Sequence, residues 1–244
     1  MLLRFLKLNN FKNLYAIFLP ISGIFGLSLL FIGLKNALIS SPIDYQQFDA
    51  VRIMYVHVPS AWLALGIYSF IAISNISAFI FRNPFFYLIA KAIAPIGAIF
   101  TLITLITGAI WGNPIWGTWW VWDARLTSVL ILFFLYLGYI ILVNSYEDAN
   151  KGEKIAAILS IVGFINIPII KFSVEFLNTL HQPASIMRSG GIAIAPEMLT
   201  PLLQMFGAFL CYTIFFGLIN IKNQLNIKRI NRLIPKLTFK KGKH

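Results

Sequence analysis

Six apolar stretches, each about as long as a bilayer is thick, constrain the fold of this chain more than any other feature. A helix that crosses the hydrocarbon core needs about 20 consecutive, mainly apolar residues. The predicted spans cover residues 14–34, 58–81, 85–110, 127–146, 155–174 and 199–221. We therefore predict an all-α polytopic membrane protein with six transmembrane helices, in which residues 1–244 form a single membrane domain.

The overall composition supports a membrane protein. Hydrophobic residues make up 59% of the chain, charged residues only 11%, and the mean hydropathy is +0.80, which lies outside the range of soluble globular domains. In a soluble protein, the net charge of +12 would suggest nucleic acid as a partner. Here the basic residues cluster outside the apolar stretches, so they report topology and we exclude nucleic acid.

The first and fifth spans need separate arguments. The first follows a basic segment (Arg4, Lys7 and Lys12), but its apolar run is long and lacks a small-residue cleavage site, so we expect a retained span rather than a signal peptide. The apolar run of the fifth is short, contains Asn166 and Pro168, and ends near residue 170. We expect it to continue past Lys171, whose ammonium can extend to the interface.

The distribution of lysine and arginine predicts the orientation. Fifteen of the 20 basic residues lie on the side that holds both termini, and the other side holds Lys35, Arg52, Arg125, Lys171 and Arg188. The positive-inside bias therefore places both termini in the cytoplasm and residues 35–57, 111–126 and 171–198 on the periplasmic side. The basic tail after residue 221 suits an anionic leaflet of the lipid bilayer.

The predicted external loop 111–126 is rich in tryptophan. It contains five of the six tryptophans of the chain: Trp111, Trp116, Trp119, Trp120 and Trp122. A single tryptophan here would be typical of the aromatic belt at a membrane interface, but five within one loop favour a platform for a flat apolar ligand. If this segment is helical, Trp116, Trp119 and Trp120 share one face.

Charged residues near this loop have both structural and functional interpretations. Asp123 is spaced to cap the fourth span before Thr127, and alternatively it could orient a ligand or a neighbouring donor. Arg52 and Arg125 suit span ends, but an arginine fork beside an apolar platform would also bind carboxylates of a ligand. Arg188 is a weaker candidate of the same kind.

The two internal histidines, His57 and His181, fall in predicted external loops on either side of the tryptophan loop. Each precedes a proline by two residues, which predicts an extended segment that leads into a helix. A lone interfacial histidine is more often structural, but two on one face favour metal ligation. With no HExxH motif and no cysteine cluster, zinc is poorly supported, whereas two imidazoles are sufficient for the axial positions of a haem iron.

Other chemistry has little support in the sequence. Cys211 is the only cysteine, so there is no CxxC redox pair and no CxxCH site for covalent haem attachment. There is no glycine-rich phosphate loop, and we expect a protein that binds and delivers rather than an enzyme.

The tryptophan loop resembles the WWD signature of haem-handling membrane proteins. The likeness rests on Trp111-Gly112, Trp116-Gly117, Trp119-Trp120 and Trp122 to Thr127. The segments RIMYVHVPSAW (52–62) and NTLHQP (178–183) are similar to the histidine segments of the CcmC family of cytochrome c maturation proteins. The likeness spans essentially the whole chain, and the longer relative CcmF has many more spans and histidines.

The resemblance implies a haem chaperone of the bacterial inner membrane, with the mitochondrial inner membrane left open by organellar relatives. It implies haem b as transient cargo, with His57 and His181 as axial ligands and residues 111–123 as the ring-binding loop. The haem would be passed to the haem chaperone CcmE, with CcmD, CcmA and CcmB as further partners. Roles for the arginines rest on charge and topology alone.

Two other functions compete with delivery of haem. A permease would move haem or another solute across the bilayer, but it needs polar residues along a midplane path, and the predicted spans offer little beyond Asn75, Asn166 and scattered serines and threonines. A membrane cytochrome would usually carry its histidines inside paired spans, whereas here both are predicted at span ends.

Overall fold

The computed structural model describes residues 8–176, 179–181, 186 and 191–241. Its elements, in chain order, are α2 (Leu8–Lys35), the π-helical turn η1 (Asn36–Ser40), the 3₁₀ turn η2 (Asp49–Ile53), α3 (Met54–Phe81), α4 (Pro84–Trp116), α5 (Ala124–Asn144), α6 (Ala149–Gly163), α7 (Asn166–Phe176) and α8 (Pro196–Lys241). Within these residues, six helical segments are long and apolar enough to cross a membrane. The predicted all-α fold with six spans is confirmed.

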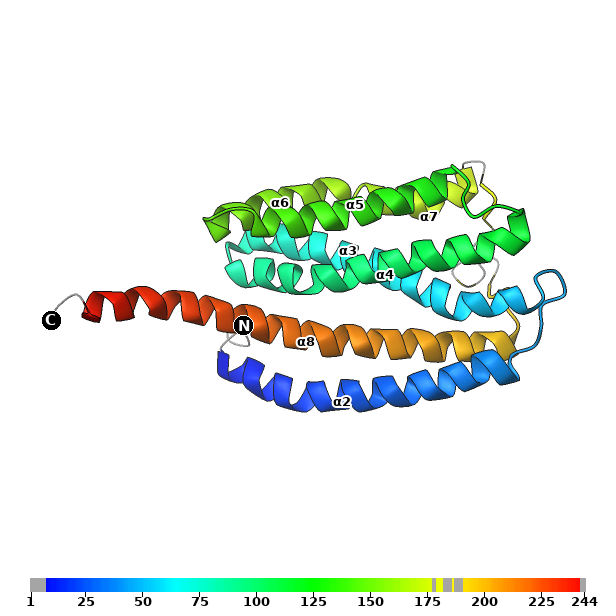
Figure 1. Cartoon of the computed structure of the whole chain (residues 1–244), viewed down its shortest axis with the longest axis horizontal. Coiled ribbons are helices and arrows are strands. Elements are labelled where there is room, and N and C mark those ends of the chain that lie inside the picture. Colours follow the sequence, from blue (N-terminus) through cyan, green and yellow to red (C-terminus); the bar gives the residue numbers. More distant parts are fainter. Residues whose placement is uncertain (1–7, 177–178, 182–185, 187–190, 242–244) are drawn as a thin grey trace.

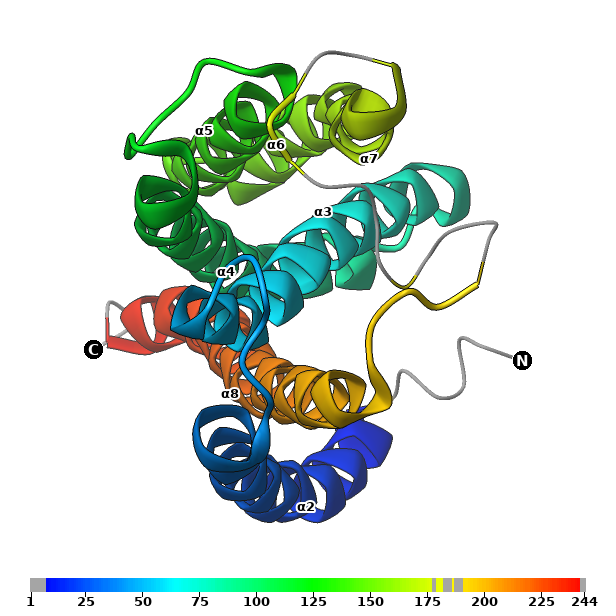
Figure 2. The ribbon, with the colours of Figure 1, turned by 90° about the vertical axis from the view of Figure 1, so that its right-hand side faces the viewer.

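The helices are arranged as two groups that meet along α3 and α4. The pair α2 and α8 packs on one side, and α5, α6 and α7 pack on the other (Figures 1 and 2). Both ends of the described chain lie at one end of the bundle. The loops after η1 and α4 lie at the opposite end, together with residues 191–195 (Figure 1). An even number of spans requires the two ends of the chain to lie at the same end of the bundle.

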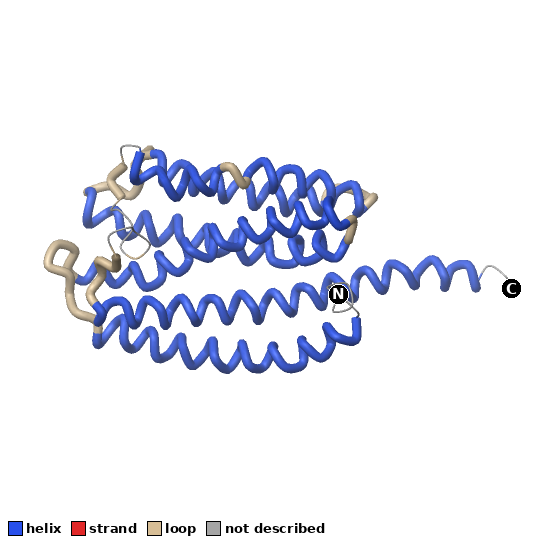
Figure 3. Tube along the Cα trace, turned by 180° about the vertical axis from the view of Figure 1, so that it is seen from behind, coloured by secondary structure: helices blue, strands red, loops and turns tan. Residues whose placement is uncertain are grey.

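Two spans differ in detail from the prediction. The fifth consists of two helices, α6 and α7, that meet at residues 164–165, and it continues past Lys171 as expected. The helix α8 is much longer than the predicted sixth span, and its C-terminal part extends beyond the rest of the bundle (Figure 3).

The tryptophan segment begins as a helix, so the expected loop at 111–116 is wrong. Gly112 and Pro114 lie inside α4, and the helix ends only where Gly117 adopts a positive φ of 70° and its N–H bonds to Asn113 O at 3.0 Å. Glycine allows this left-handed conformation without a steric penalty. The connection to α5 is therefore only residues 117–123.

The core between α3, α4, α5 and α6 is built around buried tyrosines. The Tyr136 hydroxyl donates to Ala64 O at 2.7 Å, and the rings of Tyr68 and Tyr136 are 5.1 Å apart, edge to face. A Cβ on Gly97 or on Gly163 would overlap these hydroxyl groups. The two glycines are therefore what allows α4 and α6 to pack against the tyrosines.

A second core cluster lies at the end of the bundle that carries the longer loops. It joins η2 and the start of α3 to α8 through Val51, Met54, Tyr55, Leu202 and Met205. Trp62 and Trp111 pack against this cluster. The cluster fixes the first turn of α3, which carries His57, relative to α8.

Candidate functional site

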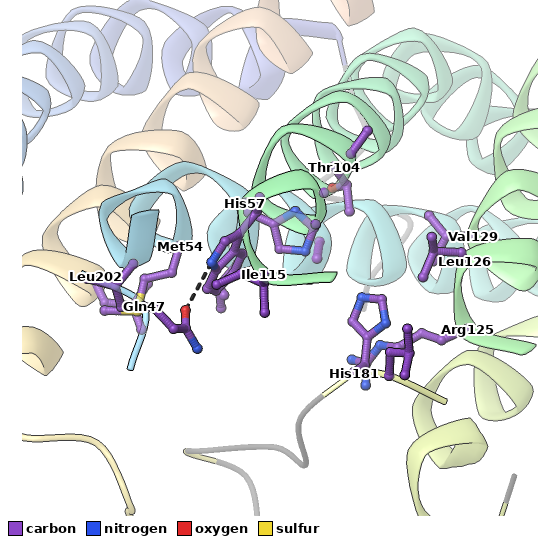
Figure 4. Close-up of a pocket in the computed structure, with 18 of the residues that line it drawn as sticks. Gln47, Met54, His57, Thr104, Ile115, Arg125, Leu126, Val129, His181 and Leu202 are labelled. Atoms are coloured by element: carbon purple, nitrogen blue, oxygen red, sulfur yellow. Dashed lines mark hydrogen bonds between the residues drawn. The ribbon is translucent and has the colours of Figure 1, made fainter. Parts of the chain in front are cut away.

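A cavity of about 690 Å³ opens among α3, α4, α5, α8 and the loops at this end of the bundle. This volume is within the range of about 300 to 1,000 Å³ that is usual for small-molecule sites. The walls are mainly apolar, and the polar groups on them include His57, His181 and Arg125. Figure 4 shows both imidazoles beside this cavity, with Arg125 next to His181.

His57 lies in the first turn of α3, so the predicted extended segment is wrong for this residue. The turn η2 runs directly into α3, and Pro59 is accommodated within the helix. The His57 ring lies edge-on to Trp111, with centroids 5.6 Å apart.

The hydrogen bonds of Thr107 indicate the tautomer of His57. The Thr107 hydroxyl donates to Ile103 O at 2.6 Å, so its oxygen is left to accept from His57 Nδ1 at 3.0 Å. With its proton on Nδ1, the imidazole has a lone pair free on Nε2. His57 Nε2 is thus available to accept a hydrogen bond or to bind a metal ion.

His181 reaches the cavity from the loop that follows α7. Its backbone N–H donates to Thr179 Oγ1 at 3.2 Å, and the Thr179 hydroxyl donates to Asp123 Oδ2. The His181 Nδ1 lies 3.5 Å from the same carboxylate oxygen, and the ring lies 5.1 Å from Trp116, edge to face. Gln182, Pro183 and Arg188 lie outside the described residues.

Charge and burial set the protonation of His181. Burial lowers the pKa of its imidazole below the usual 6.5, and the charge of Arg125 lowers it further, while the Asp123 carboxylate opposes the shift. The ring is therefore neutral at pH 7, as a metal ligand must be.

Asp123 combines the two roles that the sequence left open. Its Oδ1 accepts from Leu126 N at 2.7 Å and caps α5, while Oδ2 faces Thr179 and His181. Burial acts to raise the pKa of this carboxyl, but the hydrogen bonds from Thr179 and the Leu126 N–H outweigh burial and lower the pKa. Asp123 is thus a carboxylate that connects the α5 cap to the histidine loop.

Three of the five loop tryptophans line the cavity: Trp111, Trp116 and Trp120. Trp119 and Trp122 are exposed, at 59% and 76%. The predicted shared face of 116, 119 and 120 is absent because α4 ends at Trp116. The structure thus places the three indoles on the cavity from two different elements.

The indole nitrogens on the cavity differ in their partners. Trp111 Nε1 donates to Gln47 Oε1 at 3.0 Å, the bond that the dashed line at Gln47 marks in Figure 4. Trp120 Nε1 is buried and has no hydrogen-bond partner within the described part of the chain. A buried donor without a partner is costly, so Trp120 is a candidate to bond a ligand.

The structure separates the two predicted arginines. Arg125 lines the cavity, whereas Arg52 does not. Arg52 binds Asp49 at 2.9 Å and donates to the carbonyls of Ala37 and Leu38, so it holds η2 against η1. Of these two residues, only Arg125 is in place to meet a carboxylate of a ligand in the cavity.

Sequence reasoning missed several residues that position the site. Thr107 bonds His57, Thr179 links Asp123 to the histidine loop, and Gln47 holds Trp111. Gly108 leaves room for the imidazole, since a Cβ there would lie 3.1 Å from His57 Cε1. Thr107 and Gly108 are neighbours on α4, but a single sequence carries no signal for their contact with His57.

Together, the fold and the cavity define a class: a polytopic helical membrane protein whose tryptophan-lined cavity is reached by two histidines from separate segments. The family model described as "Heme exporter protein C" (CcmC) matches residues 1–235. The chain belongs to the CcmC family.

Relatives from bacteria and from a plant are similar over most of their length. Heme exporter protein C of Bradyrhizobium diazoefficiens is 45% identical over 224 residues, which cover 92% of this chain and 85% of the relative. The protein of the same name from Escherichia coli K12 is 39% identical over 227 residues, covering 93% and 91%. A putative ccmC-like mitochondrial protein for cytochrome c biosynthesis, from Marchantia polymorpha, is 51% identical over 177 residues, covering 72% and 75%.

Proposed function

We propose that this chain holds haem in the cavity, with His57 and His181 as axial ligands, and delivers it for cytochrome c maturation. One observation carries the proposal. Two histidines that are far apart in the sequence reach one cavity, and in each the Nδ1 faces an acceptor on the protein, which leaves Nε2 for iron. The names of the relatives support haem as the cargo and cytochrome c biogenesis as the process.

The residues on the cavity fit haem better than a bare metal ion. Two neutral imidazoles satisfy the two axial positions of a haem iron, whose other ligands come from the porphyrin. Among the described residues, no group of three or more His, Cys, Asp or Glu could hold a metal ion, which disfavours a closed zinc site. The apolar walls suit the ring, and Arg125 suits a propionate.

The tryptophans, Arg125 and the histidines on the cavity have separate tasks in holding the cargo. Trp111, Trp116 and Trp120 cover the ring and exclude water, and Arg125 sets the orientation through a carboxylate. The histidines complete the coordination of iron. In this account the chain forms and breaks no covalent bond of the porphyrin, and delivery consists of binding, protection and release.

The distribution of basic residues and the family suggest the membrane side of the site and its protein partners. The excess of basic residues at the end that carries both termini supports a cavity on the periplasmic side of a bacterial inner membrane. The acceptor is then a CcmE-type haem chaperone, with CcmD-type, CcmA-type and CcmB-type proteins as further partners. The plant relative extends the same proposal to mitochondria.

Absorption spectra of the purified protein and its histidine variants test the proposal. The wild-type protein from haem-sufficient cells should show a six-coordinate, low-spin haem, and either His57→Ala or His181→Ala should shift its Soret band. His244→Ala replaces the one remaining histidine of the chain and should leave the spectrum unchanged. Wild-type spectra in both His57→Ala and His181→Ala would refute the assignment.

A further inference from the structure

The two histidines on the cavity have unlike partners at Nδ1. His57 meets the neutral hydroxyl of Thr107 at 3.0 Å. His181 instead lies 3.5 Å from the Asp123 carboxylate. At this distance the pair is an ion-pair contact without a hydrogen bond, because within the described residues the buried His181 Nδ1 has no hydrogen-bond partner.

The carboxylate of Asp123 is held independently of the histidine. Its Oδ1 caps α5, and its Oδ2 receives the Thr179 hydroxyl, so the side chain is fixed before any ligand arrives. The distance of 3.5 Å is at the limit of a hydrogen bond. Contacts of this kind shorten when the ligand is bound, because coordination at Nε2 makes the Nδ1 proton a better donor.

The partner of a ligating histidine tunes its donor strength. A carboxylate that accepts the second N–H raises the basicity of the imidazole, and a neutral oxygen does so less. We propose that His57 and His181 are unequal ligands for haem iron: His181 is the stronger because of Asp123, and release begins at His57. This inference rests on the proposed function, since it concerns the same cavity and cargo.

Unequal ligands suit a protein that must both hold and release its cargo. Two strong axial bonds would make release slow, and two weak bonds would allow loss to the membrane. When the bond to His57 opens first, an acceptor can supply a ligand on that side while His181 still holds the iron. The helix α3 keeps His57 in place, so its bond can re-form if no acceptor is present.

The first test measures loss of haem to excess apomyoglobin from two single variants. His57→Ala keeps the His181–Asp123 pair and should lose haem several-fold more slowly than His181→Ala, which keeps only His57. Adding Asp123→Asn to His57→Ala should remove this advantage. Equal rates in the two single variants, or the reverse order, would overturn the inference.

The second test uses proteins that keep both histidines and measures the midpoint potential of the haem. Asp123→Asn keeps the α5 cap, because asparagine caps helices as well as aspartate does. It should weaken the preference for ferric over ferrous haem about tenfold, which raises the potential by about 59 mV for one electron. Thr107→Val should shift the potential by less than half of this.

Matched controls separate these effects from general damage. Asp148 caps α6 through Asn150 N, so Asp148→Asn repeats the cap substitution away from the cavity. Thr101 donates to Gly97 O on the same helix as Thr107, so Thr101→Val repeats the loss of a hydroxyl without contact to His57. Neither control should move the potential. An equal shift in Asp123→Asn and Thr107→Val would show that the ligands are equivalent.

The outcomes distinguish this inference from the proposed function. If the wild-type spectrum shows no bis-histidine haem, the proposed function itself fails. If that spectrum is present and both histidine variants change it, but rates and potentials are symmetric, only the inequality of the ligands is refuted.

Discussion

Gly108 lies directly against the imidazole of His57, where an added Cβ would stand 3.1 Å from Cε1. This distance is shorter than an ordinary carbon contact, so the ring would have to move away from α4 and from its hydrogen bond to Thr107. We predict that Gly108→Ala lowers the ratio of haem to protein several-fold and leaves the melting temperature within a few degrees. The Soret absorbance relative to that at 280 nm, together with a thermal scan, measures both.

Gly66→Ala is the matched control for this substitution, because a Cβ on Gly66 would meet nothing within 4 Å. It should leave the haem content unchanged. If both alanine variants retain wild-type haem content, the contact between Gly108 and His57 does not matter for binding.

The two groups of loop tryptophans should differ in their effect on haem. Trp120 lines the cavity with an unpartnered indole nitrogen, whereas Trp119 is 59% exposed. An aromatic contact contributes about 0.5 to 1.5 kcal/mol beyond burial, so Trp120→Ala should weaken haem binding at least several-fold. Trp119→Ala should keep wild-type affinity in a haem titration. The opposite order would mean that the ring lies on the exposed side of the loop.

Haem binding should weaken on acidification, and the midpoint of this loss should lie below the pKa of a free histidine. Binding needs neutral His181, whose pKa is lowered by burial and by Arg125. In the unfolded chain the pKa of His181 is about 6.5. The contribution of the neutral ring to the free energy of unfolding is therefore fully present above this pKa and is lost as the pH falls below it. A titration of haem affinity against pH should show the loss below pH 6.5. A midpoint above 6.5 would contradict the lowered pKa.

The tyrosine core predicts a stability effect that is independent of the cavity. Gly97→Ala would drive a methyl group into the Tyr136 hydroxyl, which is bonded to Ala64 O at 2.7 Å. Overpacking of this kind costs about 1 to 3 kcal/mol, so the melting temperature in detergent should fall. For comparison, Gly66→Ala should leave it unchanged or slightly higher, because alanine suits a helix better than glycine. Equal melting temperatures would show that the core absorbs the methyl group.

Most of the fold could be predicted because the length and hydropathy of a span are local properties. The prediction failed at the ends of two helices: α4 continues through Pro114 to Trp116, and α3 begins at Met54, ahead of Pro59, where an extended segment was expected. A proline removes one helical hydrogen bond, and surrounding helices and local adjustments compensate for it in a membrane protein. The true break is at Gly117, where a positive φ is required.

The candidate site was predictable only in its residue types. The histidines, the tryptophans and Arg125 stand out because their chemistry is rare in an apolar chain. The contacts that position them, such as Thr107 to His57 and Thr179 to Asp123, join residues 50 or more positions apart. One sequence has no local signal for such pairs, and for the same reason it could not separate Arg125 from Arg52.

The central claim is that His57 and His181 together ligate one haem, and the most direct measurement is the electron paramagnetic resonance spectrum of the oxidised, purified protein. We expect a low-spin ferric signal typical of two histidines in the wild type, which is lost in both His57→Ala and His181→Ala. A high-spin signal in the wild type, or a low-spin signal that persists in either variant without added imidazole, would contradict it.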